Sequence, residues 1–541
     1  MRGFCLYDFR YIFSVLEKVF CKEIFEGGFR SFSSKSFEML IQIVFLDFSK
    51  NSLVLRKYIG ITALSGLLLI GCGSLLGSCK SSPKSDLHQQ ENRESPPNII
   101  LIMADDQGWG DTGYNGHPNL LTPNLDKMAA SGAIFERFYA AAPVCSPTRG
   151  SVMTGRHPLR YGICTANCGH IKQEEITLAE LVKEKGYATG HFGKWHLGTL
   201  TRDTLDANRG GRAKFDGDYA PPWDNGFDVS FVTESKVPTW NPMITPPKSA
   251  EDVGDKLVEG ESFQTFYWTG PGEIVTDNLE GDDSRVIMDR AIPFIENSVN
   301  QKKPFLTIIW FHTPHLPVLS GEEYKKPYAN LSEDQQNYYG VMSALDLQVG
   351  RLRDKLEELG VAENTILFYT SDNGPEGKSV TGRTQGLTKG LKGRKRSLYE
   401  GGIRVPGIVE WKGKIAPGTK ITAPSYTSDY FPTIANLLGV DIQPYNRPYD
   451  GVDLFPFIYG NQTQREQPLA FNFESQSALI EEDYKIYRKG PNSEFELYHI
   501  KNDPGETIDL AKKDPRKLEE MVKYWEDWNA SVKRSEAGED Y

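Results

Sequence analysis

Apolar runs and amphipathic stretches alternate along most of this chain. Four short apolar runs predict buried strands. They cover residues 98–103, 187–193, 303–311 and 365–369. Capping residues and apolar positions at helical spacing predict helices over residues 122–129, 177–186, 339–359 and 429–439. This alternation favours an α/β fold, in which a mostly parallel sheet is sandwiched by helices.

The pattern changes near residue 455. Four short segments, 469–474, 477–480, 484–488 and 495–498, predict strands, and residues 515–533 predict a closing helix. We therefore expect a main domain over residues 97–455 and a smaller C-terminal subdomain over residues 456–541, with an antiparallel sheet and one helix. Residues 201–282 are rich in Gly, Asp, Pro and Trp, and they predict a long insertion over the edge of the main sheet.

The first hundred residues are predicted to lie outside the fold. Arg56 and Lys57 precede an apolar run at 59–71, which is too short for a comfortable membrane span and is followed by small residues. This order is typical of a signal peptide, here residues 56–79. Residues 1–55 lie upstream of the point where an export signal should begin, and we interpret them as an over-extended N-terminus.

Two cysteines of this region, Cys72 and Cys79, each follow a sequence that resembles a bacterial lipobox. The polar tether at 80–96 favours Cys79 as the lipid-modified residue. A cleaved secretory signal without a lipid is the alternative. We expect an exported protein, periplasmic or held to a bacterial membrane by a lipid anchor.

Length, charge and cysteine count limit the classes of protein to which this chain can belong. A length of 541 residues favours one large domain with a smaller one, and the net charge of −11 argues against a nucleic-acid partner. Of the seven cysteines, only Cys145, Cys164 and Cys168 lie beyond the signal region. The spacing of Cys164 and Cys168 permits a disulfide in an oxidising compartment, with two free thiols as the alternative. A zinc site would need two more soft ligands, and the sequence offers none at comparable spacing.

Oxygen-bearing side chains follow two of the predicted strands. Asp105 and Asp106 come just after the strand at 98–103, and Asp372 and Asn373 come just after the strand at 365–369. Open α/β proteins bind ligands at the carboxyl ends of their strands. Carboxylate and amide oxygens suit Ca²⁺ or Mg²⁺ rather than Zn²⁺. The two strand ends therefore predict a site for a hard cation.

Cys145 lies in an unusual position, between Pro143 and Pro147 and before a segment that can begin a helix. A lone cysteine is most often a buried structural residue. A helix N-terminus and the nearby Arg149 would lower the pKa of its thiol. The spacing Cys-x-Pro-x-Arg, followed by Thr154-Gly155-Arg156, points to a more specific role.

The ordered set of motifs resembles the type I, formylglycine-dependent sulfatases of the alkaline phosphatase superfamily. The resemblance covers roughly residues 97–510. It rests on Asp105-Asp106, Cys145-x-Pro147-x-Arg149, Gly193-Lys194-Trp195-His196-Leu197-Gly198, Pro314-His315-Leu316-Pro317, Ser371-Asp372-Asn373-Gly374, Lys395 before Tyr399-Glu400-Gly401-Gly402, and Asp503-Pro504-Gly505-Glu506.

The resemblance implies an alkaline-phosphatase-like α/β fold, one Ca²⁺ ion, and a formylglycine that a maturation enzyme makes from Cys145. It implies that the ion is held by Asp105, Asp106, the modified Cys145, Asp372 and Asn373. Lys194 and Lys395 would bind the sulfate and Arg149 would orient the formylglycine diol. His315 would bind substrate and protonate the leaving group, and His196 would act as the base. His312 lies three residues before His315, so the choice between them rests on the resemblance alone.

The implied activity is hydrolysis of sulfuric esters. Basic residues at 378–396, including Arg394 and Arg396, have no acidic residue among them. They favour a polyanionic substrate, a sulfated polysaccharide or oligosaccharide, over a small aryl sulfate. Two alternatives are a phosphate or phosphonate monoester hydrolase of the same superfamily and a non-catalytic surface lipoprotein that binds sulfated glycans.

Overall fold

The computed structural model describes residues 95–377 and 382–541. The predicted N-terminal extension, the signal at 56–79, Cys72, Cys79 and almost all of the tether lie outside the described residues. Among the residues that are described, no helix has both the length and the apolar character needed to cross a membrane.

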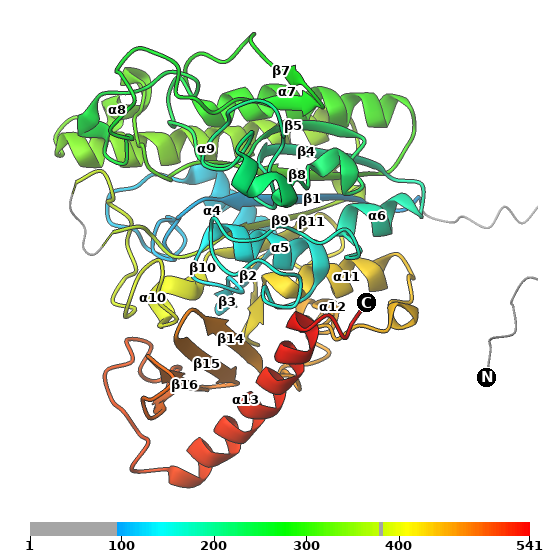
Figure 1. Cartoon of the computed structure of the whole chain (residues 1–541), viewed down its shortest axis with the longest axis vertical. Helices are drawn as coiled ribbons and strands as arrows, with labels where there is room; N and C mark the ends of the chain where they lie inside the picture. Colours follow the sequence, from blue (N-terminus) through cyan, green and yellow to red (C-terminus); the bar gives the residue numbers. More distant parts are fainter. Residues whose placement is uncertain (1–94, 378–381) are drawn as a thin grey trace, which may run out of the picture. The chain divides into compact units, whose positions relative to one another are not determined.

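A ten-stranded sheet forms the centre of the fold, in the order β12-β2-β11-β9-β1-β8-β4-β5-β6-β7 (Figure 1). Its five middle strands, from β9 to β5, are parallel to one another. The strands outside them add antiparallel pairs on both sides. The strand bounds are β1 Asn98–Ala104, β2 Ala133–Phe135, β4 Ala188–Lys194, β5 Val229–Thr233, β6 Trp268–Gly270, β7 Glu273–Ile274, β8 Phe305–Trp310, β9 Thr365–Ser371, β11 Gly407–Trp411 and β12 Thr419–Ile421.

Helices cover both faces of this sheet. Ile99 and Leu101 of β1 point into a core that includes residues of α5, α6, α11 and α12, whereas Ile100 and Ile102 point into a second core with residues of α4, α7 and α9. Successive strand residues face opposite sides, so β1 is buried along its whole length. The helix bounds are α4 Pro123–Ser131, α5 Cys145–Thr154, α6 Leu178–Lys183, α7 Asp283–Asn300, α8 Glu322–Lys325, α9 Glu333–Glu358, α10 Glu400–Ile403, α11 Tyr430–Leu437, α12 Phe455–Ile458 and α13 Pro515–Glu536.

The C-terminal residues form an antiparallel sheet, β14-β15-β16-β17. One face packs against Met521 and Trp525 of α13, which Figure 1 shows in red along these strands. The other face packs against the three-stranded sheet β10-β3-β13 and α10, through residues such as Tyr139 and Tyr426. The strands are β3 Phe138–Tyr139, β10 Arg404–Val405, β13 Ser425–Tyr426, β14 Leu469–Phe473, β15 Gln476–Glu481, β16 Tyr484–Arg488 and β17 Glu496–His499.

The predicted fold class is confirmed, both for the mostly parallel sheet between helices and for the smaller antiparallel sheet with its helix. The domain boundaries at 97–455 and 456–541 stay a prediction. Two local expectations were incomplete. Residues 201–282 are more than an insertion, because β5 lies within them and is a parallel strand of the main sheet. Helix α9 begins before residue 339, at a capping box between Ser332 and Gln335.

Candidate active site

The carboxyl ends of four neighbouring parallel strands bring the predicted site residues to one edge of the sheet. Asp105 and Asp106 follow β1, and Asp372 follows β9. Lys194 is the last residue of β4, and His315 lies in the loop after β8. Because β9, β1, β8 and β4 are adjacent in the sheet, residues far apart in the chain meet at this edge.

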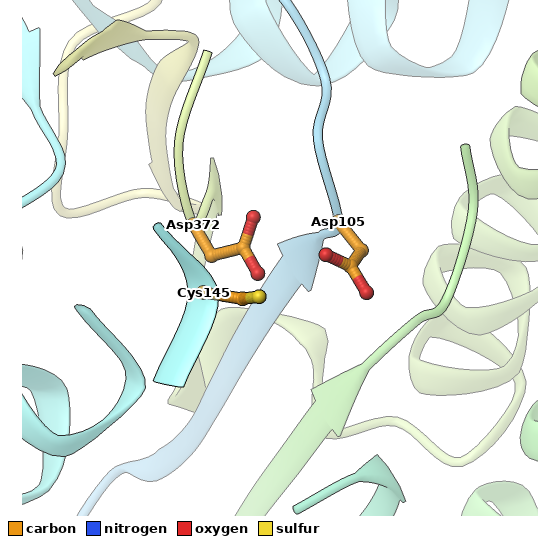
Figure 2. A group of neighbouring side chains, drawn as sticks. All are labelled: Asp105, Cys145 and Asp372. Carbon is orange, nitrogen blue, oxygen red and sulfur yellow. The ribbon is translucent and has the colours of Figure 1, made fainter. Parts of the chain in front are cut away.

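Cys145 is the first residue of α5 and is buried. One ligand atom from each of Asp105, Cys145 and Asp372 lies within 4.8 Å of the others. Figure 2 shows the thiol and the two carboxylates pointing toward one another, with Asp105 at the tip of β1. The helix start therefore places residue 145 directly beside the acidic strand ends.

The expectation that the thiol of Cys145 has a lowered pKa is wrong. Burial raises the pKa of this thiol and outweighs the nearby ammonium groups of Lys194 and Lys395. The guanidinium of Arg149 is bound to a carboxylate of the site, because its Nε and Nη2 donate to Oδ2 of Asp372 at 3.1 and 2.6 Å. Burial therefore disfavours the thiolate form of Cys145, whereas an activated cysteine has a stabilised thiolate.

Three carboxylates and three permanent cations are paired in the site. Lys194 Nζ lies 2.7 Å from Oδ2 of Asp105, and Lys395 Nζ donates to Asp106 at 2.7 Å. Asp372 is paired with Arg149, as described above. Their formal charges cancel, so a divalent cation added here would leave a net positive site for an anion.

The pKa values reflect this buried pairing. Burial by itself would raise the pKa of Asp105, but Lys194 and the other cations hold it well below its usual range. Burial raises the pKa of Asp372 to about 7, with the charge of Asp105 adding to the effect. Burial would lower the pKa of Lys395, yet Asp106 and the neighbouring negative charges raise it, so Lys395 is fully charged.

The residues present suit a hard metal ion. Oδ1 of Asp105 and Oδ1 of Asn373 are buried, and neither accepts a hydrogen bond from a described residue. Buried oxygens without partners are costly unless an ion or water satisfies them. Asp105 also groups with Asp106 and His315 within 4.8 Å. In the described part of the chain, both groupings of this kind share Asp105, so the candidate ligands form one continuous cluster around that residue.

The structure brings His315, and not His312, to this site. His315 Nδ1 donates to the carbonyl of Leu316 at 2.6 Å, and its Nε2 lies 3.7 Å from Oδ2 of Asp106. Burial lowers the pKa of His315 to about 4. Both ring nitrogens of His312 are engaged, by Asp283 at 2.8 Å and by Thr233 at 2.7 Å.

His196 lies two residues beyond the end of β4 and is buried in a left-handed backbone conformation, with φ of 58°. Neither ring nitrogen has a hydrogen-bond partner among the described residues. Burial, reinforced by Lys194 and Arg209, lowers its pKa well below the usual value, so the neutral imidazole is favoured. Ser146, next to Cys145, donates to the carbonyl of His196 at 2.5 Å.

Comparison with known proteins agrees with this geometry. Residues 97–440 match the family model described as Sulfatase. The chain belongs to the sulfatase family. It is thus a sulfatase of the alkaline phosphatase superfamily, an enzyme that hydrolyses sulfate esters.

Characterised relatives of this sulfatase support the assignment. It is 32% identical to N-acetylgalactosamine-6-sulfatase of Canis lupus familiaris over 407 residues, which is 72% of each chain. It is 33% identical to human arylsulfatase A over 385 residues, 70% of each chain. Among solved structures, Ps i-CgsB in complex with k-i-k-neocarrahexaose is 27% identical with a TM-score of 0.69, and the match covers 81% of this sulfatase and 94% of that chain.

Sequence reasoning missed several residues that support the site of this sulfatase. Asp283 and Thr233 fix the buried His312, and Glu376 accepts contacts from Lys395 at 3.3 Å and from Arg396 at 2.6 Å. The carbonyl of Glu376 also accepts from Arg394. The residues of each pair are far apart in the sequence or separated by a loop. Their spacing along the chain therefore did not indicate that they interact. Arg394 and Arg396 of the basic run are therefore bound to Glu376 rather than free to face a substrate.

Proposed function

We propose that this sulfatase removes sulfate from a sulfated saccharide, using a formylglycine made from Cys145 and one bound calcium ion. The observation that carries the proposal is the position of residue 145. Its side chain lies at a helix start, within 4.8 Å of carboxylate oxygens of Asp105 and Asp372. Burial also raises the pKa of an unmodified thiol here, which disfavours thiolate chemistry and supports chemistry at a modified residue.

The names of similar proteins support a saccharide as the substrate. One curated relative is named for N-acetylgalactosamine 6-sulfate, and one solved structure contains the oligosaccharide k-i-k-neocarrahexaose. The exposed Lys389 and the half-buried Lys392, both near Lys395 in the chain, add positive charge for a sulfated chain.

In the proposed reaction, a maturation enzyme that supplies the oxidant converts the CH2–SH of Cys145 to an aldehyde, and water hydrates it to a diol. Arg149 orients the diol. One hydroxyl loses its proton to solvent, and its oxygen attacks sulfur while the bond from sulfur to the ester oxygen breaks. His315, which we propose takes up a proton on Nε2 when the anionic substrate binds, donates that proton to the leaving oxygen. Lys194 and Lys395 stabilise the negative charge on the sulfuryl oxygens.

Release of sulfate needs a second proton transfer. His196 takes the proton from the remaining hydroxyl, the aldehyde carbonyl reforms, and the carbon–oxygen bond to sulfate breaks. A serine in place of the diol has no second hydroxyl and lacks this exit. General acid–base catalysis of this kind raises the reaction rate about 10²–10⁴-fold.

Asp105, Asp106, Asp372 and Asn373, with the modified residue 145, are the groups proposed to hold the ion. When bound, Ca²⁺ supplies positive charge that polarises sulfate oxygens and acidifies the nucleophile. Oxygen ligands of this kind suit Ca²⁺ better than Zn²⁺.

Peptide mass spectrometry across residue 145 tests the modification. In protein purified from its native host, we expect the mass of the peptide to change by the replacement of CH2–SH with CHO. The Cys145→Ser variant serves as the control, since a maturation enzyme specific for cysteine leaves it unchanged. An unmodified thiol in active native enzyme would contradict the proposal, and an unmodified, inactive protein would favour the glycan-binding alternative.

A side-by-side assay of sulfate, phosphate and phosphonate esters tests the reaction class. We expect the highest kcat/KM on sulfate esters, because the matching family model and the relatives named above are sulfatases. A preference for phosphonate or phosphate esters would favour the alternative hydrolase.

We also propose that the protein is exported and lipid-anchored. Cys164 and Cys168 are joined by a disulfide, which supports an oxidising compartment. Metabolic labelling with a radioactive fatty acid is expected to mark the wild type and the Cys72→Ser variant but not Cys79→Ser. Labelling that is lost only in Cys72→Ser would reassign the anchor, and no labelling of the wild type would favour a cleaved secretory signal.

A further inference from the structure

The C-terminal sheet holds the backbone of the segment that carries Lys395. We call residues 391–402 the lysine segment. We propose that Gln476, Lys485 and Glu506 of the C-terminal region are positioning residues, which hold Lys395 where it can bind the sulfate of the substrate. The inference rests on the proposed function in one respect, because it takes Lys395 as a sulfate-binding group.

Gln476, at the start of β15, forms two hydrogen bonds to the backbone of the lysine segment. Its Oε1 accepts from the amide of Leu398 at 3.0 Å, and its Nε2 donates to the carbonyl of Arg396 at 2.8 Å. The same Oε1 accepts from the hydroxyl of Tyr487 on β16, which fixes the amide orientation. One side chain thus defines the path of the chain immediately after Lys395.

A buried ionic cluster holds the far end of the segment. Lys485 Nζ on β16 lies 3.0 Å from Oε1 of Glu400 and 2.9 Å from Oε1 of Glu506. Oε2 of Glu506 accepts from the amide of Glu400 at 2.7 Å. All three side chains are buried, with exposed fractions of 1% or less. A cluster of this kind tolerates little displacement, because any broken pair leaves a charge buried without a partner.

The other side of the lysine segment contacts the loops of the site. The amide of Lys395 donates to the carbonyl of Pro375 at 3.1 Å, and the carbonyl of Gly402 accepts from the amide of Gly374 at 2.9 Å. Gly374 directly follows Asn373. The amide of Arg396 donates to the carbonyl of Pro143, two residues before Cys145, at 2.8 Å.

Packing between the segment and these loops is very close. A Cβ placed on Gly374 would lie 2.0 Å from the carbonyl oxygen of Gly401, so the two backbones touch. The lysine segment is therefore held between the C-terminal sheet and the loops that carry Asn373 and Cys145. None of the residues proposed for catalysis or metal binding comes from β14–β17, so this sheet serves the site by position alone.

Gln476→Ala in the full-length, matured enzyme tests the inference. Gln476 is only half-buried and uncharged, so its removal leaves no buried charge and the fold is retained. We expect KM for a sulfate ester and the inhibition constant of inorganic sulfate to rise about 3- to 10-fold, in proportion to the two lost hydrogen bonds. The melting temperature is expected to stay close to that of the wild type.

Ser475→Ala is the matched control. Its hydroxyl donates to the carbonyl of Lys489 at 3.1 Å, away from the lysine segment, so both constants should stay unchanged. Equal effects of Ser475→Ala and Gln476→Ala would overturn the inference, because they would indicate a general weakening of the sheet.

A double-mutant cycle with Lys395→Ala separates positioning from other effects. If Gln476 acts through Lys395, then Gln476→Ala adds little to the sulfate inhibition constant in the Lys395→Ala background. Additive effects overturn the positioning role and leave the proposed function intact. An unchanged sulfate inhibition constant in Lys395→Ala alone overturns the role of Lys395, and with it this inference.

Discussion

Lys194 Nζ lies 2.7 Å from Oδ2 of Asp105, although the two residues are 89 positions apart in the chain. The pair joins the carboxyl ends of β4 and β1, and both side chains are buried. The other carboxylate oxygen, Oδ1, has no hydrogen-bond partner in the described residues. One carboxylate thus faces a cationic side chain on one side and a free coordination position on the other, which suits a site that takes a metal ion and an anion together.

Loss of either lysine should remove charge stabilisation of the sulfuryl group. For Lys194→Ala and Lys395→Ala we expect kcat/KM on a sulfate ester to fall about 10²–10³-fold, the size seen when one preorganised donor is removed from a transition-state site. Steady-state kinetics of purified, matured variants measure this. Lys412→Ala, whose exposed side chain pairs with Glu357, is the matched control and should keep wild-type activity.

Removal of divalent cations should inactivate and destabilise the enzyme together. A ligand that binds only the folded state stabilises it by about 2.7 kcal/mol at a concentration 100 times its Kd. We expect a chelator to abolish activity and lower the melting temperature, and Ca²⁺ to restore both. Full activity in the chelated enzyme, or restoration by Zn²⁺ but not by Ca²⁺, would rule out the proposed ion.

If His315 is the proton donor, the loss of activity in a His315 variant should depend on the leaving group of the ester. A poor leaving group needs the acid, whereas an activated aryl ester leaves without it. His315→Ala should therefore reduce kcat/KM about 10²–10⁴-fold on an unactivated sulfate ester and far less on an activated aryl sulfate. Equal losses on both esters would argue against the acid role. His499→Ala, on the C-terminal sheet, is the control.

The buried His157 is expected to make the folded protein less stable in mild acid. Burial lowers its pKa to about 3, against an ordinary value of 6.5, and the ring packs edge-on against Trp528 of α13. Below pH 6.5 the unfolded chain therefore takes up a proton that the folded chain does not. The free energy of unfolding should fall by up to about 1.4 kcal/mol per pH unit between pH 6.5 and pH 3 from this residue.

Denaturant unfolding at several pH values measures the effect of His157. The uncharged variant His157→Gln should be less stable at pH 7 and should show a shallower loss of stability below pH 6.5 than the wild type. Identical pH slopes for the two proteins would show that His157 does not contribute.

Local pattern predicted much of the fold. Apolar runs located β1, β4, β8 and β9 to within about two residues, because a strand buried on both faces needs an uninterrupted apolar sequence. Helix α7 and strand β5 were not predicted. The burial of α7 follows from its packing on β4 and β8, and the pairing of β5 with β4 depends on residues before residue 201.

For the site, the sequence predicted which residues take part. It did not predict how their side chains contact one another. The order of the motifs identified the family and gave Asp105, Cys145, Lys194, His315, Asp372 and Lys395 as neighbours, and the structure brings them to one sheet edge. It did not show that Arg149 binds Asp372, or that burial would raise rather than lower the pKa of the Cys145 thiol. Desolvation depends on every atom around a group, which residue spacing does not contain.

The sequence by itself determined many of the element types, the sulfatase family and a set of candidate site residues, since these follow from local patterns and from motifs in a fixed order. Only the tertiary structure showed that His312 is bound to Asp283, away from the site. It also left Oδ1 of Asp105 and Oδ1 of Asn373 without partners among the described residues, and placed Gln476 and Lys485 against the lysine segment. Those relationships join residues that are far apart in the chain. They exist because the parallel strands end at a common edge and the C-terminal sheet packs beside it.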